Sequence, residues 1–75
     1  MTTPSAYPVV LEPTATGFSV YVPDLPGCVS TGSDRAEALD MIAEAIAGHI
    51  ECMVEQGEPV PAPGTVVEWV EPHAA

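Results

Sequence analysis

Eleven carboxylates dominate the chemistry open to this 75-residue chain, because they face one arginine, no lysine and two histidines. Carboxylates gathered at one point can hold two metal ions for phosphodiester cleavage. Here Glu12 ends a predicted strand and Asp24 lies in a predicted loop. Four more recur at helical spacings of four and seven residues, namely Asp40, Glu44, Glu51 and Glu55. Such a spacing forms a solvent-facing stripe, which favours a docking surface over a metal centre.

The cysteines and histidines form no stronger catalytic pattern. Cys28 and Cys52 are 24 positions apart, without a CxxC motif. A nucleophile pair of Cys28 and His49 would require the third predicted strand to face that turn of the helix. Two reduced, buried apolar thiols and a histidine at the edge of the core are the simpler interpretation. We expect no catalytic residue, no metal and no cofactor.

The formal net charge of −10 limits the partners. Binding to nucleic acid needs several lysines or arginines at phosphates, so direct contact with DNA or RNA is not expected. An acidic membrane surface is excluded on the same ground. A basic protein partner and simple solubility both remain as explanations of the acidity. No apolar run approaches the length of a membrane span, and the first eight residues lack a secretory signal, so a cytoplasmic protein is expected.

One long helix is predicted from Asp34 to Gly57. Asp34 and Glu37 form a capping box, in which each side chain accepts a bond from the backbone N–H at the other position. Gly57 can close the helix in the left-handed conformation, and Pro59 prevents continuation. The apolar stripe that must be covered consists of Leu39, Ile42, Ile46, His49 at its edge, Ile50, Met53 and Val54.

The cover is predicted to be three antiparallel strands. They occupy residues 7–12, 18–22 and 28–31, joined by a turn at 13–17 and a proline-rich loop at 23–27. Tyr7, Val9 and Leu11 share one face, as do Phe18, Val20 and Val22. A connector at 58–64 leads to a last strand at 65–70. The fold class is α+β in the order β-β-β-α-β, as one domain over residues 1–75 with a core of about 6–70.

Several motifs in this order resemble the HicB-like antitoxin family. They are Tyr7-Pro8-Val9-Val10, the run from Gly17 to Cys28 that contains Pro23-Asp24-Leu25-Pro26-Gly27, Thr31-Gly32, Glu37-Ala38-Leu39, and Glu55 to Pro61 around Gly57-Glu58-Pro59. The resemblance covers about residues 6–63. It implies a partial RNase H-like fold and an antitoxin that blocks the active site of a small, mRNA-cleaving HicA-like ribonuclease.

The chain departs from that family after Pro63. Many members carry a C-terminal DNA-binding module, whereas only 12 residues follow Pro63 here and they contain no basic helix. We therefore expect no such module and no operon repression by this chain alone. RNase H-type catalysis would need a carboxylate at the centre of the first strand, where this chain has Val9, Val10 and Leu11.

These observations predict a binding protein of antitoxin type and not an enzyme. Its contacts to a basic toxin are predicted at Asp24, Asp40, Glu44, Glu51 and Glu55. Val67 and Trp69 are predicted to mediate self-association as a homodimer or tetramer. An orphan domain that binds another protein or a small ligand is the alternative, and a metal-dependent nuclease is a further one.

Overall fold

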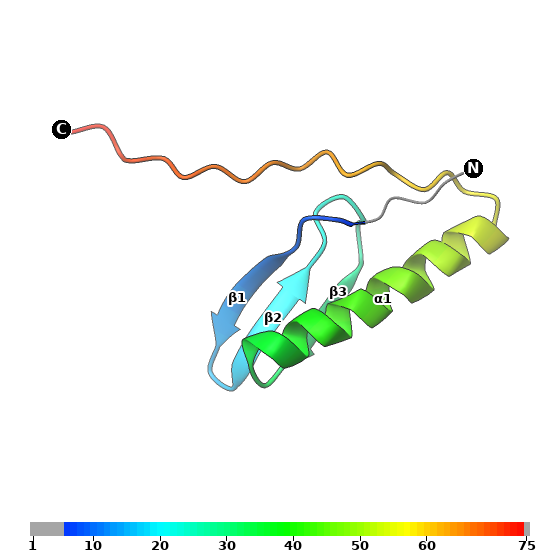
Figure 1. Ribbon diagram of the computed structural model, residues 1–75, viewed down its shortest axis with the longest axis horizontal. Coiled ribbons are helices and arrows are strands. Elements are labelled where there is room, and N and C mark those ends of the chain that lie inside the picture. Colours follow the sequence, from blue (N-terminus) through cyan, green and yellow to red (C-terminus); the bar gives the residue numbers. More distant parts are fainter. Residues whose placement is uncertain (1–5, 75) are drawn as a thin grey trace.

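The computed structural model describes residues 6–74, which form a layer of three antiparallel strands beneath one helix (Figure 1). The strands are β1, Val10–Thr14, β2, Gly17–Tyr21, and β3, Val29–Gly32, and the helix α1 is Arg35–Glu55. The sheet order is β1-β2-β3, so β1 and β3 are its edges. This confirms the predicted α+β class. Residues 1–5 and 75, at the margins of the predicted domain, lie outside the described residues.

β1 and β2 form a hairpin with a tighter turn than predicted. Pairing runs from Val10 opposite Tyr21 to Thr14 opposite Gly17, which leaves residues 15 and 16 as the turn. The strand prediction at 7–12 is thus shifted, and the turn prediction at 13–17 is too long. Proline is tolerated in an edge strand because its missing N–H needs no ladder partner. Pro13, opposite Phe18 in edge strand β1, is such a residue.

The core lies between the sheet and the first half of α1. Val20 in β2 and Val22 just after it are buried, as the predicted alternation requires. They pack with four further buried side chains, Leu25, Cys28, Ala38 and Ile42. The helix sits directly on β3 because Gly32 has no side chain. A Cβ at Gly32 would lie only 2.6 Å from the Cα of Ala38.

Both ends of α1 carry the predicted capping residues. The Asp34 side chain accepts a bond of 2.8 Å from the Glu37 N–H. The reciprocal bond differs from the prediction, since Glu37 Oε1 accepts from the N–H of Ser33, at 2.9 Å, and not from that of Asp34. At the other end Gly57 has a φ of +70°. The N–H of Glu58 reaches the Met53 carbonyl and that of Gly57 the Val54 carbonyl, which is the Schellman arrangement.

The apolar stripe of α1 is only partly covered. Ile42 is buried, and the other members except Val54 are half-buried. Val54 is 54% exposed, so its assignment to the covered stripe is wrong. Met53, about 20° around the helix from Ile42, packs against the core, whereas Val54 lies about 120° from Ile42 and so points to solvent. Cys52 is likewise exposed, contrary to the expectation that both cysteines are buried, whereas Cys28 is buried. Ala38, absent from the predicted stripe, is fully buried.

The predicted last strand at 65–70 is not a strand in the described residues. Residues 58–74 run as an extended chain past one end of the sheet and away from it (Figure 1). The residue types favour a strand, yet a strand also needs a neighbour for its backbone groups. Within residues 6–74 the sheet contains only β1, β2 and β3, so the order ends as β-β-β-α.

Candidate partner-binding surface

The four helix carboxylates form a single exposed stripe. Asp40, Glu44, Glu51 and Glu55 are all exposed side chains of α1. Their helical positions fall within about 60° of one another, on the opposite side from the buried Ile42. The stripe extends over 16 residues, from Asp40 to Glu55, and its 15 steps make about 22 Å along the helix. The structure therefore brings together four of the five predicted partner-binding residues.

Asp24 lies apart from this stripe, in the loop between β2 and β3. The loop is held by backbone bonds from Leu25 to Val22 and from Cys28 to Leu25, and Leu25 is completely buried. The Asp24 carboxylate accepts two bonds from Thr65, one from the backbone N–H at 3.3 Å and one from the hydroxyl at 3.0 Å. This predicted contact residue therefore has an internal partner 41 positions later in the chain.

A second hydrogen bond holds the segment of chain that contains Thr65. The Tyr7 hydroxyl donates to the Pro61 carbonyl at 2.6 Å. Partial burial, followed by the nearby charge of Asp24, raises the pKa of the Tyr7 phenol. The higher pKa keeps the phenol protonated and able to donate. We call these contacts, Tyr7 with Pro61 and Asp24 with Thr65, the clasp. Sequence reasoning missed it, because no local pattern links residues so far apart.

Beyond the clasp, the chain forms an exposed apolar segment. Val67 and Trp69, the predicted self-association residues, are both exposed, and Trp69 is 98% accessible. Val66 and Val70 are exposed beside them, which the sequence analysis did not single out for this role. We call Val66–Val70 the arm. None of its residues belongs to the core cluster or is among the partly buried residues packed against it.

The structure does not assemble the catalytic alternatives from the described residues. Across residues 6–74, histidines, cysteines and carboxylates nowhere gather in threes as a metal site requires. Cys28 is buried, and its burial raises the pKa of the thiol, which opposes the thiolate that a nucleophile needs. His49 is half-buried, as the interpretation of an edge histidine expects. In the same residues, no helix is long and apolar enough to cross a membrane.

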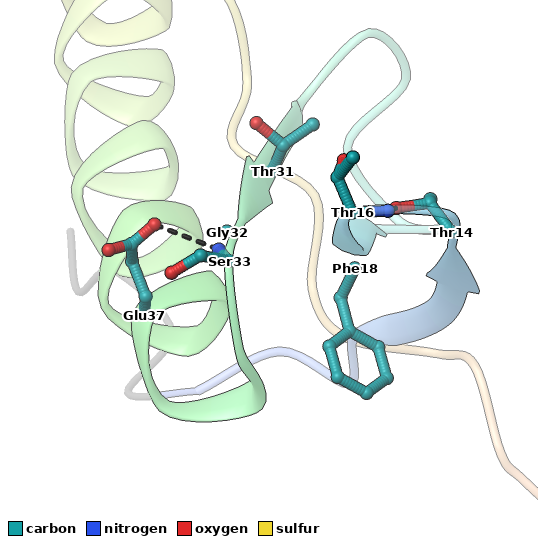
Figure 2. Close-up of a pocket in the computed structure, with 7 residues that line it drawn as sticks. All are labelled: Thr14, Thr16, Phe18, Thr31, Gly32, Ser33 and Glu37. Carbon is teal, nitrogen blue, oxygen red and sulfur yellow. Dashed lines mark hydrogen bonds between the residues drawn. The ribbon is translucent and has the colours of Figure 1, made fainter.

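A pocket of about 300 Å³ lies where the hairpin turn meets the start of α1. Figure 2 shows hydroxyl side chains from β1, the turn and β3 around it, together with Glu37 from the helix. Its lining consists of Thr14, Thr16, Phe18, Thr31, Gly32, Ser33 and Glu37. Glu37 already accepts the Ser33 N–H, so part of this polar lining serves the helix cap.

Comparisons with known proteins show what this chain is similar to. A family model described as "HicB_like antitoxin of bacterial toxin-antitoxin system" matches residues 7–74. The "uncharacterized 14.9 kDa protein in rep-hol intergenic region" of Haemophilus phage HP1 is 39% identical over 64 residues, which are 85% of this chain and 48% of that protein. "Antitoxin HicB 1" of Photorhabdus laumondii is 41% identical over 61 residues, which are 80% of this chain and 39% of that protein.

A solved structure shares the fold. A chain of the "HicA3 and HicB3 toxin-antitoxin complex" matches with a TM-score of 0.69 and 37% identity, covering 80% of this chain and 70% of that chain. The protein spans less than half the length of the phage and Photorhabdus relatives. The family match nevertheless covers nearly the whole chain, with all three strands and the helix. The protein therefore belongs to the family of HicB-like antitoxins of bacterial toxin–antitoxin systems.

Proposed function

We propose that this protein neutralises a small, basic ribonuclease toxin of the HicA type by covering the toxin's active site in the cytoplasm. On this proposal the protein acts by binding and not by catalysis. The observation that carries it is the exposed stripe of Asp40, Glu44, Glu51 and Glu55 in a chain of net charge −10. Family membership supports the role, as does similarity to a chain of a solved toxin–antitoxin complex.

The stripe suits a basic ribonuclease for a physical reason. An enzyme that cleaves RNA must attract phosphates, so its active site carries positive charge. A row of carboxylates about 22 Å long offers that positive site a surface of opposite charge. Exposed charges are screened beyond about 8 Å at physiological salt, so the stripe acts mainly at close approach. Electrostatic steering should therefore raise the association rate, and added salt should lower it.

Asp24 has a secondary place in this proposal. Its carboxylate is already bonded to Thr65, so a toxin side chain would have to share or replace those bonds. None of the stripe carboxylates takes part in the clasp, so they can contact a partner without displacing the segment that the clasp holds. The stripe is accordingly the primary contact, and Asp24 contributes only if the toxin also covers the loop.

Two variants that each lose four negative charges, at different places on the surface, test the proposal. In the stripe variant Asp40→Asn, Glu44→Gln, Glu51→Gln and Glu55→Gln change together. In the control variant Glu12, Glu58, Glu68 and Glu71, all exposed and outside α1, become Gln. Both changes take the net charge from −10 to −6, since four charges are removed. A purified HicA-type toxin, a fluorescent RNA substrate and stopped-flow binding provide the measurements.

The stripe variant should lose at least 10-fold in association rate and inhibit RNA cleavage less well, with a smaller loss in the control. Equal losses in both variants would mean that only total charge matters. If the wild-type protein neither binds nor inhibits the toxin, the antitoxin role itself is wrong.

The pocket near the hairpin turn supports a second candidate, binding of a small polar ligand. Its hydroxyls from Thr14, Thr16, Thr31 and Ser33 offer both donors and acceptors. Thr31 is exposed, and Thr31→Val removes its hydroxyl while keeping a side chain of similar shape. This change would weaken such binding without disturbing the helix stripe. A ligand screen by thermal shift with wild type and Thr31→Val separates this function from toxin binding.

A further inference from the structure

The pocket at the hairpin turn is a hollow beside the start of the acidic stripe. Its volume is about 300 Å³, and its lining comes from all three strands, the hairpin turn and the first turn of α1. Sites for drug-sized ligands have volumes of about 300 to 1,000 Å³. The pocket lies at the lower end of that range, so it suits a group of the size of one side chain better than a cofactor.

The lining is negative and rich in hydrogen-bond acceptors. Glu37 carries the only formal charge among the lining residues. Its Oε1 accepts the Ser33 N–H at 2.9 Å, which leaves Oε2 for a second donor. Hydroxyls, which can also accept, come from Thr14, Thr16, Thr31 and Ser33. An anion would be repelled by Glu37, since the lining contains no lysine or arginine, so the lining favours a cation with several donors.

Most of these hydroxyls are not used by the fold. Thr14 Oγ1 accepts from the Thr16 N–H at 3.4 Å, which is longer than the usual N–H···O distance of about 2.7–3.2 Å. Among residues 6–74, the hydroxyls of Thr16, Thr31 and Ser33 make no hydrogen bond to protein groups. All three residues are exposed, so their hydroxyls can bond to a group that enters from solvent.

The start of α1 does not cancel this preference for a cation. The N-terminus of a helix carries a partial positive charge of about half an elementary unit. Here two carboxylates accept the N–H groups at this end, because Asp34 bonds to Glu37 and Glu37 bonds to Ser33. Residues 31–44 contain four carboxylates and one basic residue, Arg35, which is not part of the lining. The surroundings of the pocket therefore remain negative.

The pocket continues the acidic stripe at its N-terminal end. Glu37 and Glu55 are 18 positions apart, which makes five full turns, so they lie on the same side of α1. Glu37 precedes Asp40 by about 4.5 Å along the helix axis. A partner that lies along the stripe therefore reaches the pocket with a side chain at the end of the same contact surface.

A guanidinium group fits the lining better than an ammonium group. Arginine presents five N–H donors in one plane and stacks on aromatic rings, whereas lysine has three donors at one point. The acceptors here are spread over β1, the turn, β3 and α1, and Phe18 adds an aromatic ring (Figure 2). We propose that the pocket anchors the guanidinium group of an arginine side chain on the toxin. This site rests on the proposed function, because it names the group by which the same partner is held.

A small arginine compound and its neutral isostere test the pocket without a toxin. N-acetyl-arginine amide and N-acetyl-citrulline amide have similar shapes, but only the first is charged. In amide NMR titrations of the full-length protein, the arginine compound should shift the Thr16, Ser33 and Glu37 signals and bind about 5-fold more tightly than the citrulline compound. Equal binding of both would indicate a site for neutral polar ligands and overturn the proposal. Shifts along α1 without shifts at the pocket would indicate general charge attraction and also overturn it.

Glu37→Gln removes the charge and keeps an oxygen for the Ser33 N–H, since glutamine also suits this capping position. It should weaken binding of the arginine compound about 5-fold, and Thr31→Val should have a smaller effect. The matched control is Glu58→Gln, at an exposed residue outside α1 and outside the lining, which also takes the net charge from −10 to −9. It should leave binding unchanged. A correctly folded Glu37→Gln protein that binds like the control overturns the proposal.

Binding to a purified HicA-type toxin separates the arginine anchor from the proposed function. Glu37→Gln should raise the Kd of the complex about 3- to 10-fold, and Glu58→Gln less than about 2-fold. If wild type binds the toxin and both variants bind equally well, the anchor is wrong and the antitoxin role stands. If wild type does not bind the toxin, the proposed function is wrong, and so is the toxin as the source of the arginine. The arginine and citrulline titrations then still decide whether the pocket selects a guanidinium group.

Discussion

The helix α1 and the arm both present exposed side chains, but the chain determines their structures in different ways. α1 is fixed by its own residues, through the Asp34 cap, the Gly57 exit and the contact of Ile42 with the core. The arm has strand-forming residues and no partner within the described chain. A helix satisfies its backbone bonds internally, whereas a strand depends on a neighbour. The comparison separates an acidic surface that one helix forms by itself from an exposed apolar segment that has no neighbouring strand among residues 6–74.

The largest effect on stability should come from the close contact between Gly32 in β3 and Ala38 in α1. Gly32→Ala places a Cβ against the backbone of Ala38, which cannot swing aside as a side chain could. We expect a loss of about 3 kcal/mol in the free energy of unfolding, enough to unfold much of a chain this small. Urea denaturation followed by circular dichroism measures it.

The matched control is Gly48→Ala, in the middle of α1, where a Cβ meets nothing within 4 Å. It should stabilise the protein by about 0.5–1 kcal/mol, because alanine is the better helix former. If both alanine variants behave alike, the close approach of β3 and α1 is not what positions the acidic stripe.

Elements with local signals were predictable from the sequence. The capping residues, the period of the helix and the alternation of Phe18, Val20 and Val22 all depend on neighbours within a few positions, and the structure confirms them. The end of β1 was misjudged because Pro13 reads as a turn until its edge position is known. Val54 and Cys52 were misassigned because they lie about 80° to 120° around the helix from the buried Ile42, and the sequence does not show how wide a stripe the sheet covers.

The candidate site was predictable only in part, for the same physical reason. The acidic stripe follows from spacing along one helix. The clasp joins residues 54 and 41 positions apart, and no local pattern encodes such pairs. The residues of the arm predict a strand, but they do not specify the strand with which it would pair.

A smaller effect should come from opening the clasp. Asp24→Ala removes the acceptor of both Thr65 bonds, whereas Thr65→Val removes only the hydroxyl and keeps the carboxylate and the backbone N–H. Each should change the free energy of unfolding by about 1 kcal/mol or less. Amide exchange of the Thr65 N–H, which donates to Asp24, should accelerate, more in Asp24→Ala than in Thr65→Val, while exchange in α1 stays the same.

Asp24→Ala also tests the contrast between α1 and the arm. Release of the segment without unfolding of the layer would show that it is a separate, weakly held unit. A loss of stability in Asp24→Ala as large as that in Gly32→Ala would show that the segment belongs to the fold, and the distinction between helix and arm would fail.

The smallest effect concerns the Tyr7 end of the clasp and appears at alkaline pH. The folded protein raises the pKa of the Tyr7 phenol by partial burial and then by the charge of Asp24. The native state therefore holds this proton more tightly than the unfolded chain does. Its contribution is fully present below the unfolded value, near 10, and is lost as pH rises through the folded pKa. Tyr7→Phe should cost about 0.5 kcal/mol at pH 7, since it removes the single bond to Pro61.

That cost should shrink above about pH 10, because the wild-type protein loses the contribution that the phenylalanine variant never had. Burial also raises the pKa of the Cys28 thiol, so alkaline destabilisation from Cys28 occurs in both proteins and cancels in their difference. Urea midpoints between pH 8 and 11 give this difference, with Tyr21→Phe as the control for loss of a phenol outside the clasp. A constant gap across that range would contradict the raised pKa of the Tyr7 phenol in the folded protein. A narrowing gap with an unchanged helix signal would show that the segment leading to the arm can be loosened while the acidic stripe keeps its structure.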